Sequence, residues 1–69
     1  MYNNMIAWLR KNGFEKMEPN SYANHKCNVV FEGKEIAVSN NQGYAEYIPS
    51  NLYALIGLLT YHDFLNYKE

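Results

Sequence analysis

The first apolar residues of the chain recur with the spacing of an amphipathic helix. Met5, Ile6 and Leu9 fall on one side of a helix predicted over residues 4–12. Gly13 follows directly, and glycine readily adopts the left-handed backbone conformation that ends many helices. The pattern therefore predicts a short helix that stops at Gly13.

The middle of the chain changes to the alternation of apolar and polar residues that is typical of half-buried strands. Two strands, over residues 26–32 and 34–39, are predicted to form a hairpin around a turn at Glu32-Gly33. The positions predicted to face the core are Cys27, Val29, Phe31, Ile36 and Val38.

Shorter strands are predicted on either side of this hairpin. Residues 14–18 form a strand that ends at Pro19, because proline donates no hydrogen bond to a sheet. The stretch from Pro19 to Ser21 has the composition of a turn. After another turn over residues 40–43, residues 44–48 can add a fourth strand. The chain thus predicts a meander of three or four antiparallel strands.

A second helix is predicted near the end of the chain, over residues 51–62. Ser50 is its expected N-cap, since serine side chains accept hydrogen bonds from the first free amides of a helix. The residues predicted to face the core are Leu52, Leu55, Ile56 and Leu59. Successive strands with a helix at each end indicate one α+β domain over residues 1–69, with both helices on one face of the sheet.

The other side of this last helix is also apolar, which is unusual for a surface helix. No formally charged residue occurs between Glu46 and Asp63. The second apolar face consists of Ala54, Gly57, Leu58, Tyr61 and Leu65. Either the first helix covers this face, or another protein packs against it, a second copy of the chain included.

Composition narrows the class of protein. Of the 69 residues, 48% are apolar and 19% are charged, a balance typical of a folded chain rather than a disordered one. The formal net charge of −1 argues against a surface built to bind nucleic acid. No stretch approaches the roughly 20 apolar residues that span a bilayer. A single cysteine gives no internal disulfide framework, and we expect a cytoplasmic domain.

His25 and Cys27 are the residues closest to known site chemistry. Two positions apart in a predicted strand, they share a face and could act as base and nucleophile. Alternatively, they could bind a metal together with His62 and Asp63. Packing is the stronger interpretation, because Cys27 alternates with the apolar core positions of its strand. We therefore expect a buried, slowly reacting thiol, no metal site and no cofactor.

Turn and cap residues recur along the chain in an order shared with a known family. They are Asn12-Gly13-Phe14 at the end of the first helix, Asn24-His25 before the long strand, the Glu32-Gly33 turn, and Pro49 before the last helix. This layout resembles the HicA-type toxins, small ribonucleases of bacterial toxin–antitoxin pairs with a fold like the double-stranded-RNA-binding domain. The resemblance implies ribonuclease or RNA-binding activity, with His25 as the catalytic residue.

Two functional hypotheses are consistent with these observations. The first is a non-enzymatic protein-interaction module that forms a homodimer through the second apolar face of its last helix. The second is a HicA-like ribonuclease or RNA-binding toxin that uses His25. We prefer the first, because the six basic residues are scattered along the chain and the net charge is negative.

Overall fold

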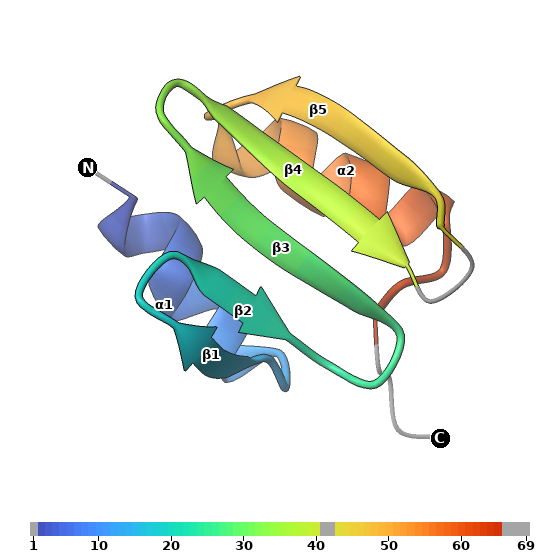
Figure 1. Ribbon diagram of the computed structural model, residues 1–69, viewed down its shortest axis with the longest axis horizontal. Helices are drawn as coiled ribbons and strands as arrows, with labels where there is room; N and C mark the ends of the chain where they lie inside the picture. Colours follow the sequence, from blue (N-terminus) through green and yellow to red (C-terminus); the bar gives the residue numbers. More distant parts are fainter. Residues whose placement is uncertain (1, 41–42, 66–69) are drawn as a thin grey trace.

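The computed structural model describes residues 2–40 and 43–65 as a helix, five strands and a second helix (Figure 1). The elements are α1 (Asn3–Lys11), β1 (Glu15–Glu18), β2 (Ser21–Ala23), β3 (Cys27–Glu32), β4 (Glu35–Asn40), β5 (Ala45–Pro49) and α2 (Leu52–Tyr61). This confirms the predicted α+β class and the order helix, antiparallel sheet, helix. The sheet has five strands in place of the three or four predicted.

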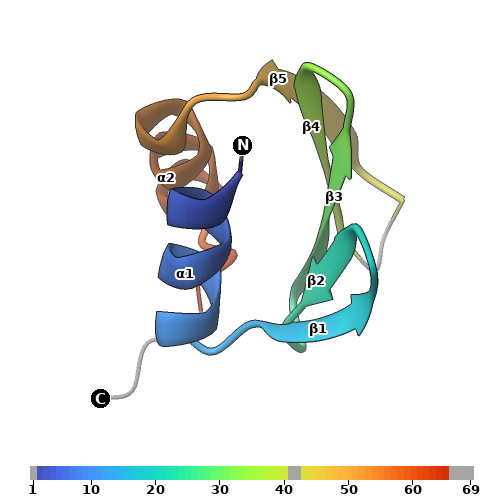
Figure 2. The same cartoon turned by 90° about the vertical axis from the view of Figure 1, so that its left-hand side faces the viewer.

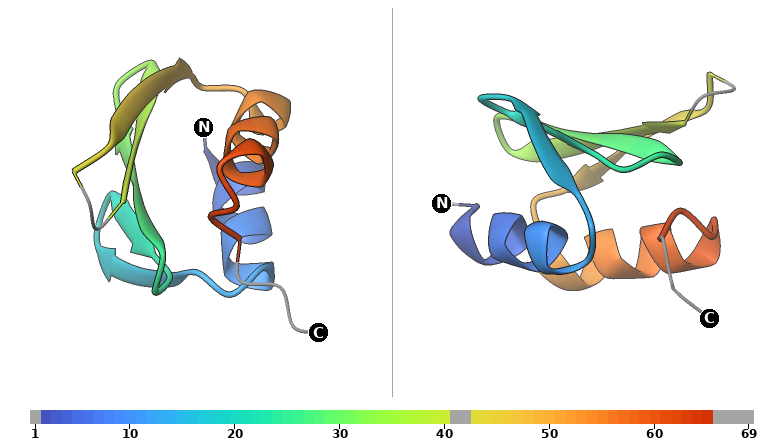
Figure 3. Two further views of the ribbon diagram at one scale, coloured as in Figure 1. Left: turned by 90° about the vertical axis from the view of Figure 1, so that its right-hand side faces the viewer. Right: turned by 90° about the horizontal axis from the view of Figure 1, so that it is seen from below.

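Each strand pairs in antiparallel fashion with its neighbour in sequence, in the order β1-β2-β3-β4-β5. Both helices cover the same face of this sheet (Figure 2). Among the residues described, neither helix has the length and apolarity needed to cross a bilayer. α1 lies toward β1 and β2, whereas α2 lies behind β4 and β5 (Figures 1 and 3). β1 and β5 are therefore the two edges of the sheet, each with its own helix nearby.

The additional strand is β2, which overlaps the predicted turn only at Ser21 and otherwise covers residues for which no element was predicted. It pairs with both β1 and β3, and its central residue, Tyr22, lies opposite Val29. Tyr22 is buried and so contributes to the core. A strand of three residues is too short to display a period of two in the sequence. The turn that follows Pro19 is accordingly shorter than predicted.

One core lies between the sheet and the helices. The inward positions predicted for the central hairpin are all buried, namely Cys27, Val29, Phe31, Ile36 and Val38. Met5 and Leu9 are the buried residues of α1. The predicted stop of this helix is confirmed by a φ of +93° at Gly13. The next amide, that of Phe14, donates to the Leu9 carbonyl at 2.9 Å, so the Phe14 ring turns back into the core.

The second helix begins one residue later than predicted, so the assignment of Ser50 as its N-cap is wrong. Asn51 is the N-cap, and its side-chain Oδ1 accepts hydrogen bonds from the amides of Tyr53 (2.8 Å) and Ala54 (3.1 Å). Ser50 still extends the β4–β5 ladder, because its amide donates to the Lys34 carbonyl at 2.9 Å. This hydrogen bond holds Ser50 at the end of the ladder, and the next residue, Asn51, caps the helix.

Candidate functional site

An open groove of about 410 Å³ runs between α2 and the edge strand β5. Its lining residues come from both elements and are Glu46, Ile48, Ala54, Gly57, Leu58, Tyr61 and His62. Four of the five residues predicted on the second apolar face of α2 are among them. They form one stripe along the helix, because positions three and four apart lie on the same side. The structure thus places that face beside an edge of the sheet.

The same structure contradicts part of the predicted interface. Leu58 and Leu65, predicted on a face that either the first helix or another protein covers, are 9% and 2% exposed and belong to the core of the chain itself. Leu58 forms the floor of the groove, whereas Leu65 does not line it. Ala54, Gly57 and Tyr61 are exposed. Leu58 and Leu65 are therefore buried within the single chain and need no partner to cover them.

A different rotation of α2 explains why Leu58 is buried. The helix buries Leu55, Leu58 and Leu59, whereas Leu52 and Ile56 of the predicted core stripe are only partly buried. When a helix has apolar residues on two sides, its own sequence does not determine which side faces the core. The choice between the two is made by the sheet against which it packs.

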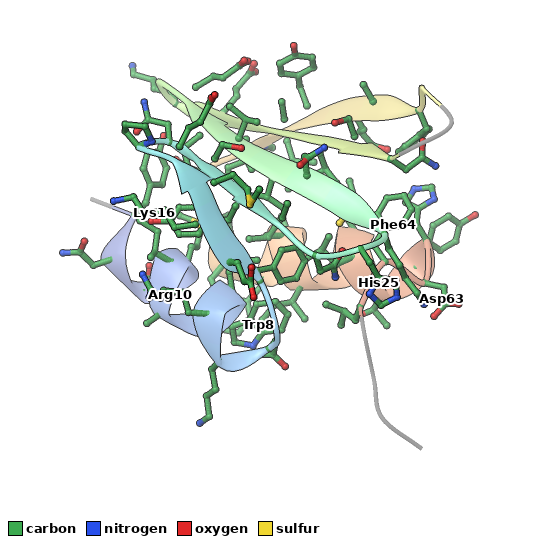
Figure 4. All side chains as sticks on the ribbon, turned by 60° about the horizontal axis from the view of Figure 1, so that its bottom comes forward. Trp8, Arg10, Lys16, His25, Asp63 and Phe64 are labelled. Atoms are coloured by element: carbon green, nitrogen blue, oxygen red, sulfur yellow. The ribbon has the colours of Figure 1, made fainter. Side chains whose placement is uncertain are left out.

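Leu65 is buried because the chain after α2 is held against the loop between β2 and β3. The Asn24 side chain fixes this loop by accepting a hydrogen bond from the Lys26 amide at 2.8 Å. Its Nδ2 also donates to the Phe64 carbonyl at 2.8 Å. Lys26 Nζ donates to the Asp63 carbonyl at 3.2 Å. Asp63 and Phe64, on the segment that follows α2, are labelled in Figure 4. These bonds direct the segment that carries Phe64 and Leu65 into the core.

Gly57 is not required by the fold of the single chain. A β-carbon at this position would meet nothing within 4 Å. A glycine inside a helix costs about 0.8–1.0 kcal/mol relative to alanine, so the chain would be more stable with a side chain here. The missing side chain leaves the backbone of α2 open where it borders the groove.

Two polar residues line the groove, Glu46 and His62, and both contact Tyr44, which does not itself line it. The Tyr44 hydroxyl donates a hydrogen bond to Glu46 Oε1 and lies 2.9 Å from His62 Nε2. His62 Nε2 is 3.8 Å from the same carboxylate oxygen. The bond to Glu46, followed by burial, raises the pKa of Tyr44 to about 12. The Tyr44 hydroxyl therefore stays protonated near neutral pH and donates its hydrogen bond to the Glu46 carboxylate.

Sequence reasoning missed this polar cluster. Tyr44 and Glu46 are two positions apart at the start of β5, and that spacing was the available local signal. His62 joins them from the end of α2, and its ring centroid lies 4.6 Å from that of Tyr44. The contact bridges 18 positions in sequence, which no periodicity predicts.

Within residues 2–40 and 43–65, no strand pairs with the outer edge of β5, so its outward backbone groups have no strand partner there. The Asn40 amide donates to the Tyr44 carbonyl at 3.0 Å, and the Ser50 amide donates to the carbonyl of Lys34, the residue before β4. Because successive residues of a strand direct their backbone groups to opposite sides, the even-numbered residues of β5 face β4. Ala45 and Tyr47 consequently direct N–H and C=O outward. Pro49 directs only its carbonyl outward, since proline has no N–H.

His25 lies in the loop between β2 and β3, where its side chain is exposed. It lines a hollow of about 360 Å³ at the β1 edge of the sheet. The other residues of this hollow are Gly13, Glu15, Met17, Ala23 and Asn24. An exposed imidazole thus shares a concave surface with the carboxylate of Glu15.

Cys27 is separated from His25 by this arrangement, because β3 begins at Cys27 and His25 precedes it. Cys27 is 1% exposed and faces the core, which confirms its predicted burial. Burial, partly offset by the charge of Lys26, raises the pKa of its thiol to about 11. Such a thiol stays protonated near neutral pH and is a poor nucleophile. Within residues 2–40 and 43–65, no group of three or more His, Cys, Asp or Glu side chains could hold a metal ion.

Comparison of the chain with protein-family models, with curated proteins and with solved structures found no match.

Proposed function

We propose that this chain is a non-enzymatic protein-interaction module of the cytoplasm that binds a second copy of itself. Its contact surface consists of the groove between α2 and β5 together with the outer edge of β5. The carrying observation is that an edge strand with unpaired backbone groups lies directly beside an exposed helix face without formal charge. Edge strands of this kind pair readily with another chain.

The character of the exposed side of α2 supports this surface. Tyr53 and Tyr61 are 82% and 84% exposed, and the helix carries no charged residue. A helix that only meets water normally presents a polar, charged side. Gly57 favours close approach, since an added β-carbon would meet nothing within 4 Å and glycine lowers helix stability. Tyrosine at interfaces combines a large apolar area with a hydroxyl that can still hydrogen-bond.

The burial of Leu58 and Leu65 changes what drives the association. These leucines already lie in the core, so they add nothing when a partner binds. The available contributions are the ring of Tyr61, the open helix backbone at Gly57 and the outward backbone groups of β5. The proposed contact is therefore flatter and more polar than the sequence alone suggests.

Sedimentation velocity and light scattering over a wide concentration range test the proposal. We expect a dimer, and we expect Ala54→Glu to shift the protein to a folded monomer by placing a charge in the groove. Thr60→Glu is the matched control, because Thr60 is exposed on the same helix but does not line the groove. It should leave the dimer intact. A wild-type protein that stays monomeric at millimolar concentration would refute self-association.

A second candidate function is the HicA-like ribonuclease or RNA-binding activity that uses His25. It is supported by the exposure of His25 and by its position, with Glu15, on one hollow. A histidine and a carboxylate are a common general acid–base pair. The Glu15 charge works against it, because a carboxylate repels the phosphates of RNA.

RNA assays separate the two candidate functions. Under the second candidate, the protein cleaves or binds RNA with steep salt dependence, and His25→Ala abolishes cleavage while the chain remains folded. Under the first, neither binding nor cleavage is detected, and His25→Ala leaves the dimer unchanged. In the cleavage assay alone, His62→Ala is the control for loss of an imidazole that does not line the hollow.

A further inference from the structure

We infer that the second copy binds by adding its β5 to the β5 edge, antiparallel and centred on Tyr47, so that the two five-stranded sheets become one continuous sheet. This inference rests on the proposed self-association and specifies its geometry. A two-fold axis then passes between the two Tyr47 residues, and each copy presents the same surface to the other.

The outward backbone groups of β5 match this register. With Tyr47 at the centre, each Tyr47 N–H donates to the Tyr47 carbonyl of the other copy. Each Ala45 N–H donates to the Pro49 carbonyl of the other copy. Pro49 lacks an N–H. In this register the only donor it would supply is one to the Ala45 carbonyl of the other copy, and that carbonyl remains accessible to water. The ladder therefore uses every outward N–H that β5 offers.

The side chains favour the same register over its neighbour. Centring the ladder on Glu46 would set the two Glu46 carboxylates directly opposite each other, and like charges in that position destabilise a strand pair. Centring it on Tyr47 sets Glu46 opposite Ile48 and brings the two Tyr47 rings together on the face of the sheet away from the helices. Aromatic cross-strand pairs contribute to the stability of antiparallel sheets.

The charges of the surface indicate a second copy rather than an acidic or a basic partner. Glu46 is the only formally charged residue of β5 and the groove, and its carboxylate already accepts a hydrogen bond from Tyr44. A strongly acidic segment would find no positive charge on this surface, and a strongly basic one would find a single carboxylate. With a second copy in the register centred on Tyr47, each Glu46 lies opposite Ile48, so the two carboxylates do not face each other.

The exposed rings beside the edge supply contact area. Tyr47 is 58% exposed and Tyr61 is 84% exposed. A tyrosine buries on the order of 150–250 Å², so these rings from two copies provide a large part of the roughly 1,000 Å² that a stable interface needs. The remainder comes from the paired backbones and the rim of the groove.

Substitution of Tyr47 tests strand pairing separately from side-chain contact. Tyr47→Pro removes the central outward N–H, which faces away from β4, and should weaken dimerisation roughly 10- to 100-fold. Tyr47→Val keeps that N–H and should weaken it clearly less. Equal weakening by both variants would mean that the ring, not the backbone, makes the contact, and would overturn the inference.

Amide hydrogen exchange of the wild-type protein gives a test without any variant. The Ala45 and Tyr47 amides should exchange fast in dilute monomer and at least tenfold more slowly in the dimer. A dimer in which both amides still exchange fast would overturn the strand ladder while leaving self-association in place. A protein that remains monomeric throughout would refute both, so the two failures are distinguishable.

Discussion

The two edges of the sheet, β1 and β5, differ in the features by which proteins keep strands from pairing with another chain. β1 has four residues, all exposed, and three of them are charged. Its register is interrupted between Lys16 and Glu18, and Pro19 follows directly. β5 pairs regularly with β4 over its whole length and carries one charge, Glu46. Short length, charge, irregularity and proline all discourage edge pairing, and they are concentrated at β1.

The residues of β1 themselves discourage pairing with another chain, whereas β5 has few such features and leaves its edge available to a partner. At β1, the nearby hollow contains His25 and Glu15 and is open to solvent. At β5, the neighbouring groove is floored by Ile48 and Leu58, both buried. An edge with a single charge and a mostly apolar groove lie side by side, which is why the interaction surface is proposed there.

The largest effect is expected from Leu58→Glu, which breaks the β5 side of the comparison. Because Leu58 packs into the core at the bottom of the groove, Leu58→Glu removes its apolar contacts and leaves a carboxylate only partly hydrated, and we expect a loss of about 2–5 kcal/mol in the free energy of unfolding. Urea unfolding followed by circular dichroism measures this loss. A folded, fully stable Leu58→Glu monomer would instead restore the view that Leu58 belongs to a surface.

A smaller loss is expected at the β1 side from Gly13→Val. Gly13 has a φ of +93°, a conformation that strains any residue with a branched β-carbon. We expect a loss of about 1–3 kcal/mol, because α1 would no longer stop where the chain must turn into β1. Urea melts measure it, with Asn12→Val as a control for the same side chain one residue earlier.

Gly57→Ala should separate stability from association at the groove. Nothing lies within 4 Å of the added methyl group, so the folded monomer should gain about 1 kcal/mol from helix propensity. If a second copy approaches the helix backbone here, the same methyl group should weaken the dimer. Stability is measured by urea unfolding at low concentration, and association by sedimentation. If Gly57→Ala instead strengthened both the folded monomer and the dimer, nothing would pack closely against Gly57.

The smallest change in stability is expected from Ala45→Lys, which gives β5 the kind of charge that protects β1. Ala45 is exposed at the sheet edge, and substitutions at such positions usually change the free energy of unfolding by less than about 0.5 kcal/mol. The variant should nevertheless be monomeric at concentrations at which the wild type is dimeric. Lys16→Arg, at the edge that is already charged, should change neither property.

Some features of the molecule followed from local patterns. Alternation at Cys27, Val29 and Phe31 predicted the inward face of β3, because a period of two leaves no other way to bury those residues together. Gly13 predicted the end of α1 for a similarly local reason, namely its freedom to adopt positive φ. The location of the candidate groove along α2 was partly predicted as well, through the stripe that contains Ala54 and Tyr61.

Other features were missed because they depend on contacts between distant segments. β2 is a strand only because β1 and β3 lie on either side of it. Ser50 does not cap α2, because its amide is used by the ladder with β4. The cluster of Tyr44 and His62 joins the start of β5 to the end of α2, and no spacing in the sequence announces it.

By itself the sequence determined the α+β class, the inward residues of the central hairpin and the stop of α1, since each depends on periodicity or on the conformational freedom of one residue. The rotation of α2 was decided only by tertiary structure. Apolar residues surround much of that helix, so its own pattern has no single best side. Packing against the sheet selected the rotation that buries Leu55, Leu58 and Leu59. That selection left Ala54, Gly57 and Tyr61 facing the groove beside β5.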